Sequence, residues 1–409
     1  MNLLIISTSD IGGAANACFR LHNALLDEKI NSKVIVSKKQ KNYRNTFLFK
    51  NNIINTFILK TISFLKYKIK LRKRSKELEL FSFPDSNFDI TKSELYKDAT
   101  IINLHWVARF LDFNFFKKNK KPVIWTLHDM NPFTGGEHYD EEYLGIDEFG
   151  FPIKRILSKS EKKLFKKIIS YKKKCIDKIE NLTIVAPSEW LANEARKSKV
   201  FGSKPIYCIP YGLDSEIFSP KDRQKSRDLL KIPQDKKVLL FVADSILNSR
   251  KGFIYLKKAL EQIEDPNVIL CAIGKNQINF KSTNNIIELG SINNDELLSH
   301  VYSSADVFII PSLMDNLPNT VLESLFCSTP VIGFPIGGIP EMIQDGVNGY
   351  LTEDVSVQSL TKTIQNFLDN PDFFDKKQIR ENAVNKYDQT IQAKKYIELF
   401  KKIAKKNDT

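Results

Sequence analysis

Two carboxylates eight positions apart are the most specific chemical feature of this chain. Asp315 and Glu323 lie in the stretch PSLMDNLPNTVLESL, and Glu323 falls on an otherwise apolar helix face with Val321, Leu322, Leu325 and Phe326. A carboxylate on an apolar helix face is costly unless hydrogen-bonding partners satisfy it. At a helix start that faces a cleft, the two carboxylates can accept hydrogen bonds from vicinal hydroxyls of a sugar. The alternative, a carboxylate favoured by the positive end of the helix dipole, explains Asp315 better than Glu323.

An adjacent arginine and lysine form a second candidate site. Arg250 and Lys251 occur in NSRKGF, between an apolar run and a helical pattern. Arginine binds phosphate with its planar fork and lysine acts as a point charge, so the pair suits a diphosphate. The alternative is a solvated basic turn. It is weakened because residues 209–409 hold 24 Lys/Arg and 26 Asp/Glu, a net charge of −2.

Paired glycines follow the first apolar run. Gly12 and Gly13 stand between that run and a helical pattern. Glycines at such a turn permit positive φ and let an anion approach the amino end of a helix. A plain tight turn is the alternative. The full G-x-G-x-x-G pattern is absent, so dinucleotide binding is not supported.

A histidine and an aspartate end another apolar run. His128 and Asp129 occur in TLHDMNPFTGGEHY, which holds two of the five histidines of the chain. A histidine titrates near neutrality and can act on a substrate hydroxyl, and a neighbouring carboxylate can orient it. The alternative is a loop histidine satisfied by the backbone. The position at the carboxyl end of a strand favours a functional role.

The elements that must position these residues alternate between short β-branched runs and longer helical patterns. The predicted strands are 2–7, 32–37, 100–106, 122–128, 182–187, 205–210, 237–244, 267–274, 286–291, 306–312 and 329–335. Continuous apolar strands that alternate with helices indicate parallel sheets covered on both faces. The two series predict an α/β protein with two Rossmann-like doubly wound domains, whose ligands bind at the carboxyl ends of the strands.

A connector with little periodicity separates the two series. It is the stretch IPYGLDSEIFSPKDRQ, which contains two prolines and a glycine. We therefore predict a first domain over residues 1–208 and a second over 209–385. Residues 386–409 end in a basic amphipathic pattern and are expected to form a helix that packs back on the first domain.

Composition excludes several classes of protein. The chain has 409 residues, 42% of them apolar and 27% charged, as in ordinary globular proteins. Its five cysteines are scattered and form no C-x-x-C pair, which argues against a disulfide framework or a thiolate zinc site and fits a reducing cytoplasm. No stretch is apolar enough to span a membrane, and the first residues are expected to be a buried strand rather than a signal peptide.

The positive charge is concentrated in the first half of the chain. Residues 1–208 hold 38 Lys/Arg and 22 Asp/Glu, a net charge of +16, against +14 for the whole chain. Residues 54–76 combine apolar residues at helical spacing with a basic cluster. This pattern predicts contact with an anionic membrane surface, and the alternative is a helix whose apolar seam faces the core. Nucleic acid is not expected, because aromatic residues are not interleaved with the basic ones.

Taken together, these motifs resemble glycosyltransferase family 4, whose members are retaining enzymes of the GT-B fold, with two facing Rossmann-like domains. The resemblance extends over nearly the whole chain. It is carried by the GGA turn, the segment LHD-x-x-P-x-TGG, VAPSEWLA, IPYGLDSEIF, RKGF and the block PS-x-x-D-x7-E through DGVNGYL.

The resemblance implies a role for each candidate residue. Glu323 matches the acidic residue that holds the nucleotide ribose, and Asp315 the one that holds hydroxyls of the transferred sugar. Lys251 matches the lysine on the diphosphate, and His128 the histidine near the transferred sugar and the acceptor. His128 and Asp315 are thus the expected catalytic residues. The expected donor-binding residues are Gly12, Gly13, Arg250, Lys251, Asn316, Leu317 and Glu323.

The chain departs from the family pattern at three places. Asp315 is shorter than the usual glutamate. Asn316, Leu317 and Pro318 stand where the family has Gly-Phe-Gly, and Pro318 offers no N–H. Ile246 stands about where the family has an arginine, and Arg250 is expected to substitute for it. These departures resemble a subgroup that makes bacterial surface polysaccharides.

The resemblance implies transfer of a sugar, with retention, from a nucleoside-diphosphate sugar to a hydroxyl of a growing glycan or lipid-linked acceptor. The first domain would hold the acceptor and the second the donor, at the cytoplasmic face of the cell membrane. No D-x-D metal motif in its structural context is present, so we expect no metal and no other cofactor. The alternatives are a sugar-nucleotide epimerase of the same fold and a basic binding protein that has lost activity.

Overall fold

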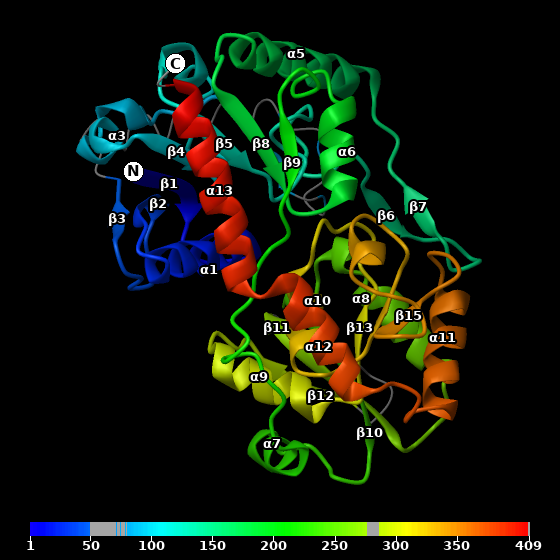
Figure 1. Ribbon diagram of the computed structural model, residues 1–409. Coiled ribbons are helices and arrows are strands. Elements are labelled where there is room, and N and C mark those ends of the chain that lie inside the picture. Colours follow the sequence, from blue (N-terminus) through cyan, green and yellow to red (C-terminus); the bar gives the residue numbers. More distant parts are fainter. Residues whose placement is uncertain (50–70, 72–73, 75–77, 79, 276–285, 408–409) are drawn as a thin grey trace. The chain divides into compact units, whose positions relative to one another are not determined.

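The computed structural model describes residues 1–49, 71, 74, 78, 80–275 and 286–407 (Figure 1). The chain forms two compact units. Unit 1 comprises Met1–Glu142, Ile156–Pro210 and Gln392–Thr409, and unit 2 comprises Tyr143–Arg155 and Tyr211–Ile391. Each unit is built on a parallel sheet with helices, so the predicted α/β fold of two Rossmann-like domains is confirmed.

The sheet of unit 1 has the strand order β3-β2-β1-β4-β5-β8-β9. Its strands are β1 (Asn2–Ser9), β2 (Asn31–Lys38), β3 (Thr46–Leu48), β4 (Ile101–Leu104), β5 (Val123–Thr126), β8 (Leu182–Ala186) and β9 (Ile206–Cys208). Every neighbouring pair is parallel. The strand order reverses between β1 and β4, and in such sheets ligands bind at the carboxyl ends of the strands beside this reversal.

The helices of unit 1 come from distant parts of the chain. They are η1 (Ile90–Lys92), a short 3₁₀ helix, and α1 (Gly13–Asp27), α3 (Glu94–Asp98), α4 (Phe115–Lys118), α5 (Lys159–Ile176), α6 (Glu189–Lys197) and most of α13 (Gln389–Asn407). Helix α5 begins where a capping box predicts a helix start, because the Ser158 side chain accepts from the Glu161 N–H and Glu161 accepts from the Ser158 N–H.

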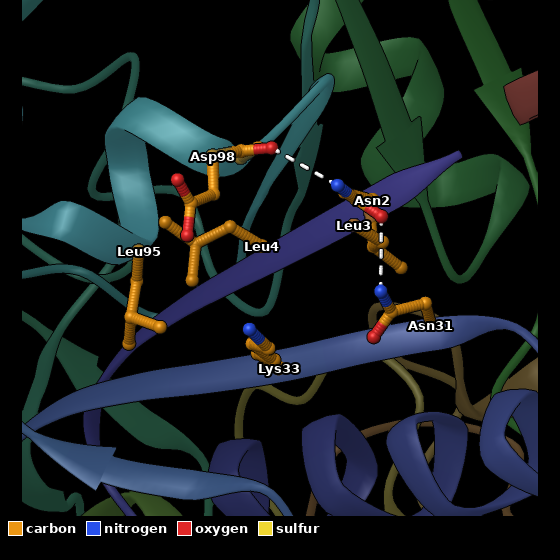
Figure 2. Close-up of a pocket in the computed structure, with 8 residues that line it drawn as sticks. Asn2, Leu3, Leu4, Asn31, Lys33, Leu95 and Asp98 are labelled. Atoms are coloured by element: carbon orange, nitrogen blue, oxygen red, sulfur yellow. Dashed lines mark hydrogen bonds between the residues drawn. The ribbon is translucent and has the colours of Figure 1, made fainter.

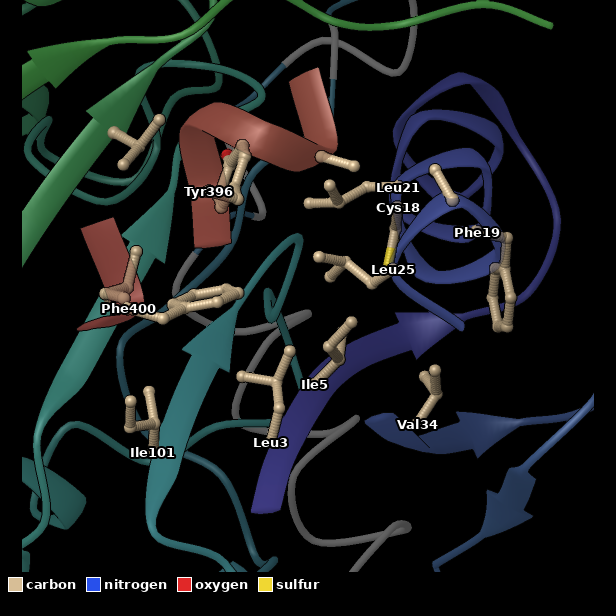
Figure 3. Close-up of a cluster of buried hydrophobic side chains, with 14 of the residues drawn as sticks. Leu3, Ile5, Cys18, Phe19, Leu21, Leu25, Val34, Ile101, Tyr396 and Phe400 are labelled. Atoms are coloured by element: carbon tan, nitrogen blue, oxygen red, sulfur yellow. The ribbon is translucent and has the colours of Figure 1, made fainter. Parts of the chain in front are cut away.

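The core of unit 1 joins both ends of the chain. Side chains of α1, β1, β2, β4 and α13 meet in one buried cluster (Figure 3). Tyr396 and Phe400 of α13 are fully buried there, beside Leu21 and Leu25 of α1. The final helix is therefore part of the hydrophobic core of unit 1.

The sheet of unit 2 has the order β12-β11-β10-β13-β14-β15 and is also parallel throughout. Its strands are β10 (Lys237–Ser245), β11 (Val268–Lys275), β12 (Ile286–Gly290), β13 (Val307–Ile310), β14 (Val331–Gly333) and β15 (Gly349–Leu351). The order reverses between β10 and β13. The loops after these two strands therefore lie at the position where a doubly wound sheet binds its ligand.

The helices of unit 2 include two short 3₁₀ helices. The helices are α7 (Arg223–Leu230), η2 (Ser249–Lys251), α8 (Phe253–Leu260), α9 (Asp295–Ser304), α10 (Asn319–Phe326), η3 (Ile339–Glu341), α11 (Val357–Asp369) and α12 (Lys376–Tyr387). Helix α8 packs against α11, α7 against α9, and α10 against α12.

A β-hairpin from the first half of the chain belongs to unit 2. Strands β6 (Tyr143–Ile146) and β7 (Pro152–Lys154) pair antiparallel, and the Val357 N–H donates to the Gly150 carbonyl at 3.1 Å. This segment falls within the predicted first domain, residues 1–208. Its two short strands form a separate two-stranded sheet and lack the apolar run by which the longer strands are predicted.

Candidate active site

The loops after β10 and β13 are joined to each other in unit 2. The Leu313 N–H donates to the Arg250 carbonyl at 2.8 Å. Gly252 has φ +70°, and a Cβ on it would lie 1.7 Å from the Pro311 carbonyl oxygen. Only glycine therefore permits this close approach. The result is a fixed distance between η2, which carries the two cations, and the loop that carries Asp315.

Arg250, Lys251 and Asp315 form one charged cluster at this edge of the sheet. Lys251 Nζ lies 2.6 Å from Asp315 Oδ2, and Arg250 Nη1 lies 3.4 Å from the same oxygen. Arg250 also donates to the Met314 carbonyl at 2.8 Å. Asp315 is buried, with 8% of its surface exposed. Residues that the sequence singles out separately, 64 and 65 positions apart, thus come into direct contact.

The charge of Asp315 is stabilised by these neighbours. Burial by itself raises the pKa of the Asp315 carboxyl, but the charges of Lys251 and Arg250 and the hydrogen bonds from Lys251 and the Asn316 N–H outweigh it. The net effect is a pKa below the ordinary value. Asp315 is therefore ionised near neutrality and neutralises part of the positive charge of the cluster.

The backbone around Asp315 is also fixed from the side of β14. The Gly338 N–H donates to the Asp315 carbonyl at 3.0 Å. Asn316 and Leu317, the other expected donor-binding residues in this loop, are both buried. In the described part of the chain the buried hydroxyl of Ser312 has no hydrogen-bond partner. This loop is therefore held by backbone contacts on two sides.

Glu323 lies on α10 and accepts a hydrogen bond from another helix. The Tyr302 hydroxyl of α9 donates to Glu323 Oε2 at 3.0 Å, and both side chains are buried. This contact provides one of the partners that a carboxylate on an apolar helix face needs. Tyr302 was not predicted as a partner of Glu323, because nothing in the α9 pattern distinguishes a buried tyrosine with a polar partner from one without.

In unit 1, the turn after β1 is open at the amino end of α1. Gly12 precedes the helix with φ +100°, and a Cβ on Gly12 or Gly13 would meet no atom within 4 Å. Asp10, just before them, is fully buried and accepts from the backbone N–H groups of Gln40 and Lys41. The loop after β2 is therefore fastened beside the glycines.

His128 follows β5 and contacts a second histidine. His128 Nε2 lies 3.0 Å from Nδ1 of His105, and His105 Nε2 lies 3.1 Å from Oδ1 of Asn103. Burial lowers the pKa of His128 to about 4, although the nearby charge of Asp129 acts in the opposite direction. Burial lowers the pKa of His105 well below its ordinary value. Both rings are therefore neutral at pH 7.

Asp129 binds groups from two other segments of unit 1. Asp129 Oδ2 accepts from Trp106 Nε1 at 2.8 Å and contacts His138 Nδ1 at 2.5 Å. His138 Nε2 in turn lies 3.0 Å from the Ser82 hydroxyl. Ser82 is buried with 1% of its surface exposed. The serine, histidine and aspartate thus resemble a catalytic triad in their contacts, but the hydroxyl is enclosed, and the network fixes the loop that follows His128.

Two cavities of unit 1 lie at opposite edges of its sheet. A cavity of about 20 Å³ at the carboxyl ends of β4 and β5 is lined by His105, Trp106, His128, Asp129 and Asn131, among others. A pocket of about 190 Å³ lies at the amino ends of β1 and β2, where Asn2 hydrogen-bonds Asn31 and the Asp98 carbonyl (Figure 2). Doubly wound sheets bind ligands at the carboxyl edge, so the candidate site lies with His128.

The predicted basic segment 54–76 lies almost entirely outside the described residues. Arg74, one of its members that is described, is buried in ion pairs with Glu137 at 2.7 Å and Glu142 at 2.9 Å. It is therefore a structural residue and contributes nothing to a lipid-facing surface. Lys172 of α5 is buried too, and donates to the carbonyls of Asn131 and Thr134 in the loop after His128.

Within the described ranges, no group of three or more His, Cys, Asp or Glu side chains is arranged to hold a metal ion. In the same part of the chain, none of the helices has the length and apolar character needed to cross a membrane.

Comparison with known proteins gives the class of protein to which the fold and this site correspond. Residues 222–386, which contain Arg250, Lys251, Asp315 and Glu323, match the family described as glycosyl transferases group 1. The matched region covers most of unit 2.

Two curated proteins illustrate the similarity in sequence. D-inositol 3-phosphate glycosyltransferase of Mycolicibacterium smegmatis is 26% identical over 176 residues, which is 40% of this chain and 40% of that protein. The enzyme of the same name from Mycobacterium tuberculosis is 27% identical over 196 residues, covering 43% of this chain and 39% of that protein. The chain thus spans about two fifths of the length of the curated relatives it matches.

Solved structures resemble nearly the whole chain. Sucrose-phosphate synthase from Thermosynechococcus elongatus has a TM-score of 0.69 at 16% identity, over 98% of this chain and 99% of that one. Anabaena HepE in complex with UDP-glucose has a TM-score of 0.67 at 15% identity, over 98% of this chain and 100% of that one. These similarities establish the GT-B type of fold, and the comparisons together support a glycosyltransferase of that type.

Proposed function

We propose that the protein is a retaining glycosyltransferase of family 4 that transfers a sugar from a nucleoside-diphosphate sugar to an acceptor hydroxyl. The observation that carries this proposal is the contact of Arg250 and Lys251 with Asp315 at the strand reversal of unit 2. In this proposal the two cations of the cluster bind the diphosphate, for which Arg and Lys are suited, and the carboxylate accepts hydrogen bonds from sugar hydroxyls. Solved structures of the same fold are described with UDP, UDP-glucose and ADP, which supports a nucleotide donor.

In this proposal the two cations stabilise the negative charge that develops on the leaving diphosphate. Because the cations are provided by the chain itself, the reaction needs no metal ion or other cofactor. Glu323 binds the ribose and Asp315 binds hydroxyls of the transferred sugar. Asn316, Leu317 and the turn of Gly12 and Gly13 line the donor site. The leaving phosphate takes the acceptor proton on the same face, and His128 orients the acceptor hydroxyl.

The proposed acceptor is a growing glycan or a lipid-linked glycan of a bacterial surface polysaccharide, reached at the cytoplasmic face of the membrane. One solved structure of this fold is described as a glycosyltransferase of lipopolysaccharide biosynthesis, WaaG, with 12% identity and a TM-score of 0.60. The net charge of +16 on residues 1–208 also supports an anionic surface as partner. In α5 the exposed lysines that contribute to it are Lys159, Lys162, Lys163, Lys166, Lys167, Lys173 and Lys174.

A nucleotide panel tests the donor. Thermal unfolding is measured with UDP-, GDP-, ADP- and dTDP-sugars and the free diphosphates, with and without EDTA. A ligand that binds only the folded protein at one hundred times its Kd adds about 2.7 kcal/mol to the free energy of unfolding. We expect one nucleotide series to stabilise the wild type and to lose this effect in Lys251→Ala. Absence of stabilisation by every nucleotide would contradict the proposed function.

Sedimentation with lipid vesicles tests the membrane surface. We expect the wild type to sediment with anionic vesicles at low salt and to be released at high salt, because each basic residue near such a surface contributes on the order of 1 kcal/mol, screened by salt. Neutralising Lys162, Lys163, Lys166 and Lys167 should weaken sedimentation. If the protein stays in the supernatant under all conditions, the basic first half is solvated surface and the proposed membrane contact is wrong.

A further inference from the structure

Exposed apolar side chains are concentrated on the hairpin of β6 and β7 in unit 2. The exposed fractions are 58% for Leu144, 64% for Phe149, 42% for Phe151 and 45% for Ile153. These are four of the fourteen large apolar side chains that are exposed among the described residues, yet all four lie between positions 144 and 153. Single exposed apolar side chains are normal, whereas a cluster of them marks a surface that meets a partner. The hairpin is therefore a candidate interaction surface.

Strand pairing gathers three of these side chains on one face of the hairpin. A bulge between Tyr143 and Ile146 leaves Leu144 opposite Ile153, so the two are cross-strand neighbours. Phe151 comes two positions before Ile153 and precedes a proline, which favours an extended backbone. Side chains two positions apart on an extended strand point to the same side. The three side chains thus form one continuous apolar face.

The turn that carries the fourth side chain, Phe149, is fixed by hydrogen bonds. One carboxylate oxygen of Asp147 accepts from the N–H of Phe149 at 3.0 Å and from the N–H of Phe151 at 2.8 Å. The Asp147 N–H donates to the Phe151 carbonyl at 2.9 Å, and the Gly150 N–H donates to the Asp147 carbonyl at 3.2 Å. Asp147 therefore closes the turn with both its backbone and its side chain. A side chain presented by an ordered turn loses little conformational freedom when it binds.

The rest of the hairpin packs on unit 2. Strand β6 lies against η2, which carries the two cations of the proposed donor site (Figure 1). At the tip, the Gly150 carbonyl accepts from the Val357 N–H at the start of α11. Gly150 has φ +88°, and a Cβ on it would lie 2.5 Å from the side-chain oxygen of Gln358. The tip therefore fits closely against α11, while Phe149 and Phe151 on either side of this glycine stay exposed.

The size of the apolar surface favours lipid over a second protein as the partner. At about 200 Å² for a large side chain, the four exposed fractions amount to roughly 400 Å². A stable protein interface buries about 800 Å² on each partner, twice this area. A lipid surface sets no such minimum, because its binding strength scales with the apolar area that enters it.

Positive charge close along the chain fits an anionic lipid. Helix α5 begins at Lys159, after the four residues that follow the end of β7. It carries the seven exposed lysines of the proposed membrane contact. Buried apolar area and attraction to anionic headgroups add in the membrane affinity of a peripheral protein, and stable binding takes more than one such signal.

We propose that Leu144, Phe149, Phe151 and Ile153 form a surface that inserts into the interfacial layer of an anionic lipid bilayer. This inference rests on the proposed function, in which the acceptor is reached at a membrane, and it assigns the apolar part of that contact to the hairpin. Because β6 lies against η2, insertion brings the donor side of unit 2 next to the bilayer in which a lipid-linked acceptor is embedded.

A tryptophan at the tip measures insertion directly. Phe149→Trp in the full chain is mixed with vesicles of equal parts phosphatidylglycerol and phosphatidylcholine, whose acyl chains carry bromine near the headgroup or near the chain end. We expect the shallow bromine to quench its fluorescence more than the deep one, above the background of the three native tryptophans. Leu229→Trp is the matched control, because Leu229 of α7 is 57% exposed in the same unit, and it should not be quenched. Equal quenching of the two variants, or no quenching of either, would overturn the proposal.

The salt dependence of binding separates insertion from the attraction of α5. Partition coefficients are measured by sedimentation with the same lipids over a range of salt concentrations. The double variant Phe149→Ser, Phe151→Ser should bind about tenfold or more weakly than the wild type at each concentration, because two apolar side chains no longer leave water. Its salt dependence should stay that of the wild type, whereas neutralising Lys162, Lys163, Lys166 and Lys167 should reduce the salt dependence. Leu229→Ser should bind like the wild type. A double variant that binds like the wild type would refute insertion.

Two further measurements keep the outcomes distinct. The melting temperature of each variant verifies that it folds, and if the double variant does not fold, the quenching of Phe149→Trp decides alone. Sedimentation velocity without vesicles should show the wild type and Phe149→Ser in the same state of association. A dimer that Phe149→Ser dissociates would assign the surface to a second copy of the chain and overturn the membrane proposal. The vesicle measurements use no nucleotide, so this inference and the proposed transferase activity fall separately.

Discussion

Replacing Asp315 with asparagine should destabilise unit 2 and at the same time strengthen the binding of a free nucleoside diphosphate. The substitution keeps the shape of the side chain and removes its charge. Lys251 Nζ, 2.6 Å away, and Arg250 Nη1, 3.4 Å away, then lose their ion pairs with Asp315. A diphosphate then no longer competes with the Asp315 charge for Lys251 and Arg250.

The size of the effect follows from the burial of the three side chains. Leaving one partner of a fully buried pair uncompensated costs about 3–5 kcal/mol, whereas an exposed pair is worth about 0–1 kcal/mol. The side chains of Asp315, Arg250 and Lys251 are 11%, 17% and 22% exposed. We therefore expect a loss of about 2 kcal/mol, which lowers the melting temperature of a domain of this size by about 4–8 °C. The free energy of UDP binding should become more favourable by about 1.4 kcal/mol, which is a tenfold gain in affinity.

Calorimetric unfolding of the full chain, with and without UDP, measures the first effect, and isothermal titration with UDP measures the second. If the panel identifies another base, its diphosphate replaces UDP. Glu353→Gln is the matched control in unit 2, because its pair with Lys362 at 3.9 Å has both side chains more than 80% exposed. The control should leave both quantities unchanged. If Asp315→Asn also leaves the melting temperature and the UDP affinity unchanged, the cluster carries no significant electrostatic energy and the reasoning is refuted.

Three further predictions concern other parts of the chain. Glu323→Ala should abolish donor binding and lower the free energy of unfolding by about 1–3 kcal/mol, because the Tyr302 hydroxyl loses its hydrogen bond to Glu323. Tyr302→Phe should retain donor affinity in titration calorimetry. Equal donor affinity of both variants and the wild type would remove Glu323 from the site. Gly252→Ala should lower the melting temperature far more than Gly346→Ala, because both have positive φ but only Gly252 has a carbonyl oxygen 1.7 Å from the added Cβ. Burial lowers the pKa of Lys172 to about 7, so the unfolded chain binds more protons than the folded one above that pH. The melting temperature of the wild type should therefore rise relative to that of Lys172→Met between pH 7 and pH 9, and a constant difference would show that Lys172 does not titrate there.

The sequence by itself determined the fold class and the separate positions of the candidate residues. Apolar runs such as 237–244 and 306–312 appear as the central strands β10 and β13, because a strand buried on both faces needs apolar side chains at every position. His128 and Asp315 each follow such a run, so their location at the carboxyl end of a strand is predictable from the chain alone. The edge strands β3 and β15 were not predicted, because the apolar runs around them are shorter than those around the equally short strands β9 and β14.

Only the tertiary structure decided which of these residues are partners. Arg74 belongs to a basic stretch that suggests a lipid surface, yet it is buried against two carboxylates more than 60 positions away. Asn103 and His105 look like the polar end of a strand, and form a chain of hydrogen-bond contacts to His128 because β4 lies beside β5 in the sheet. Periodicity along a chain reports which face of an element is buried. It carries no information about which distant polar group shares that buried space, because this depends on strand order and on the backbone contacts that bring the loops together.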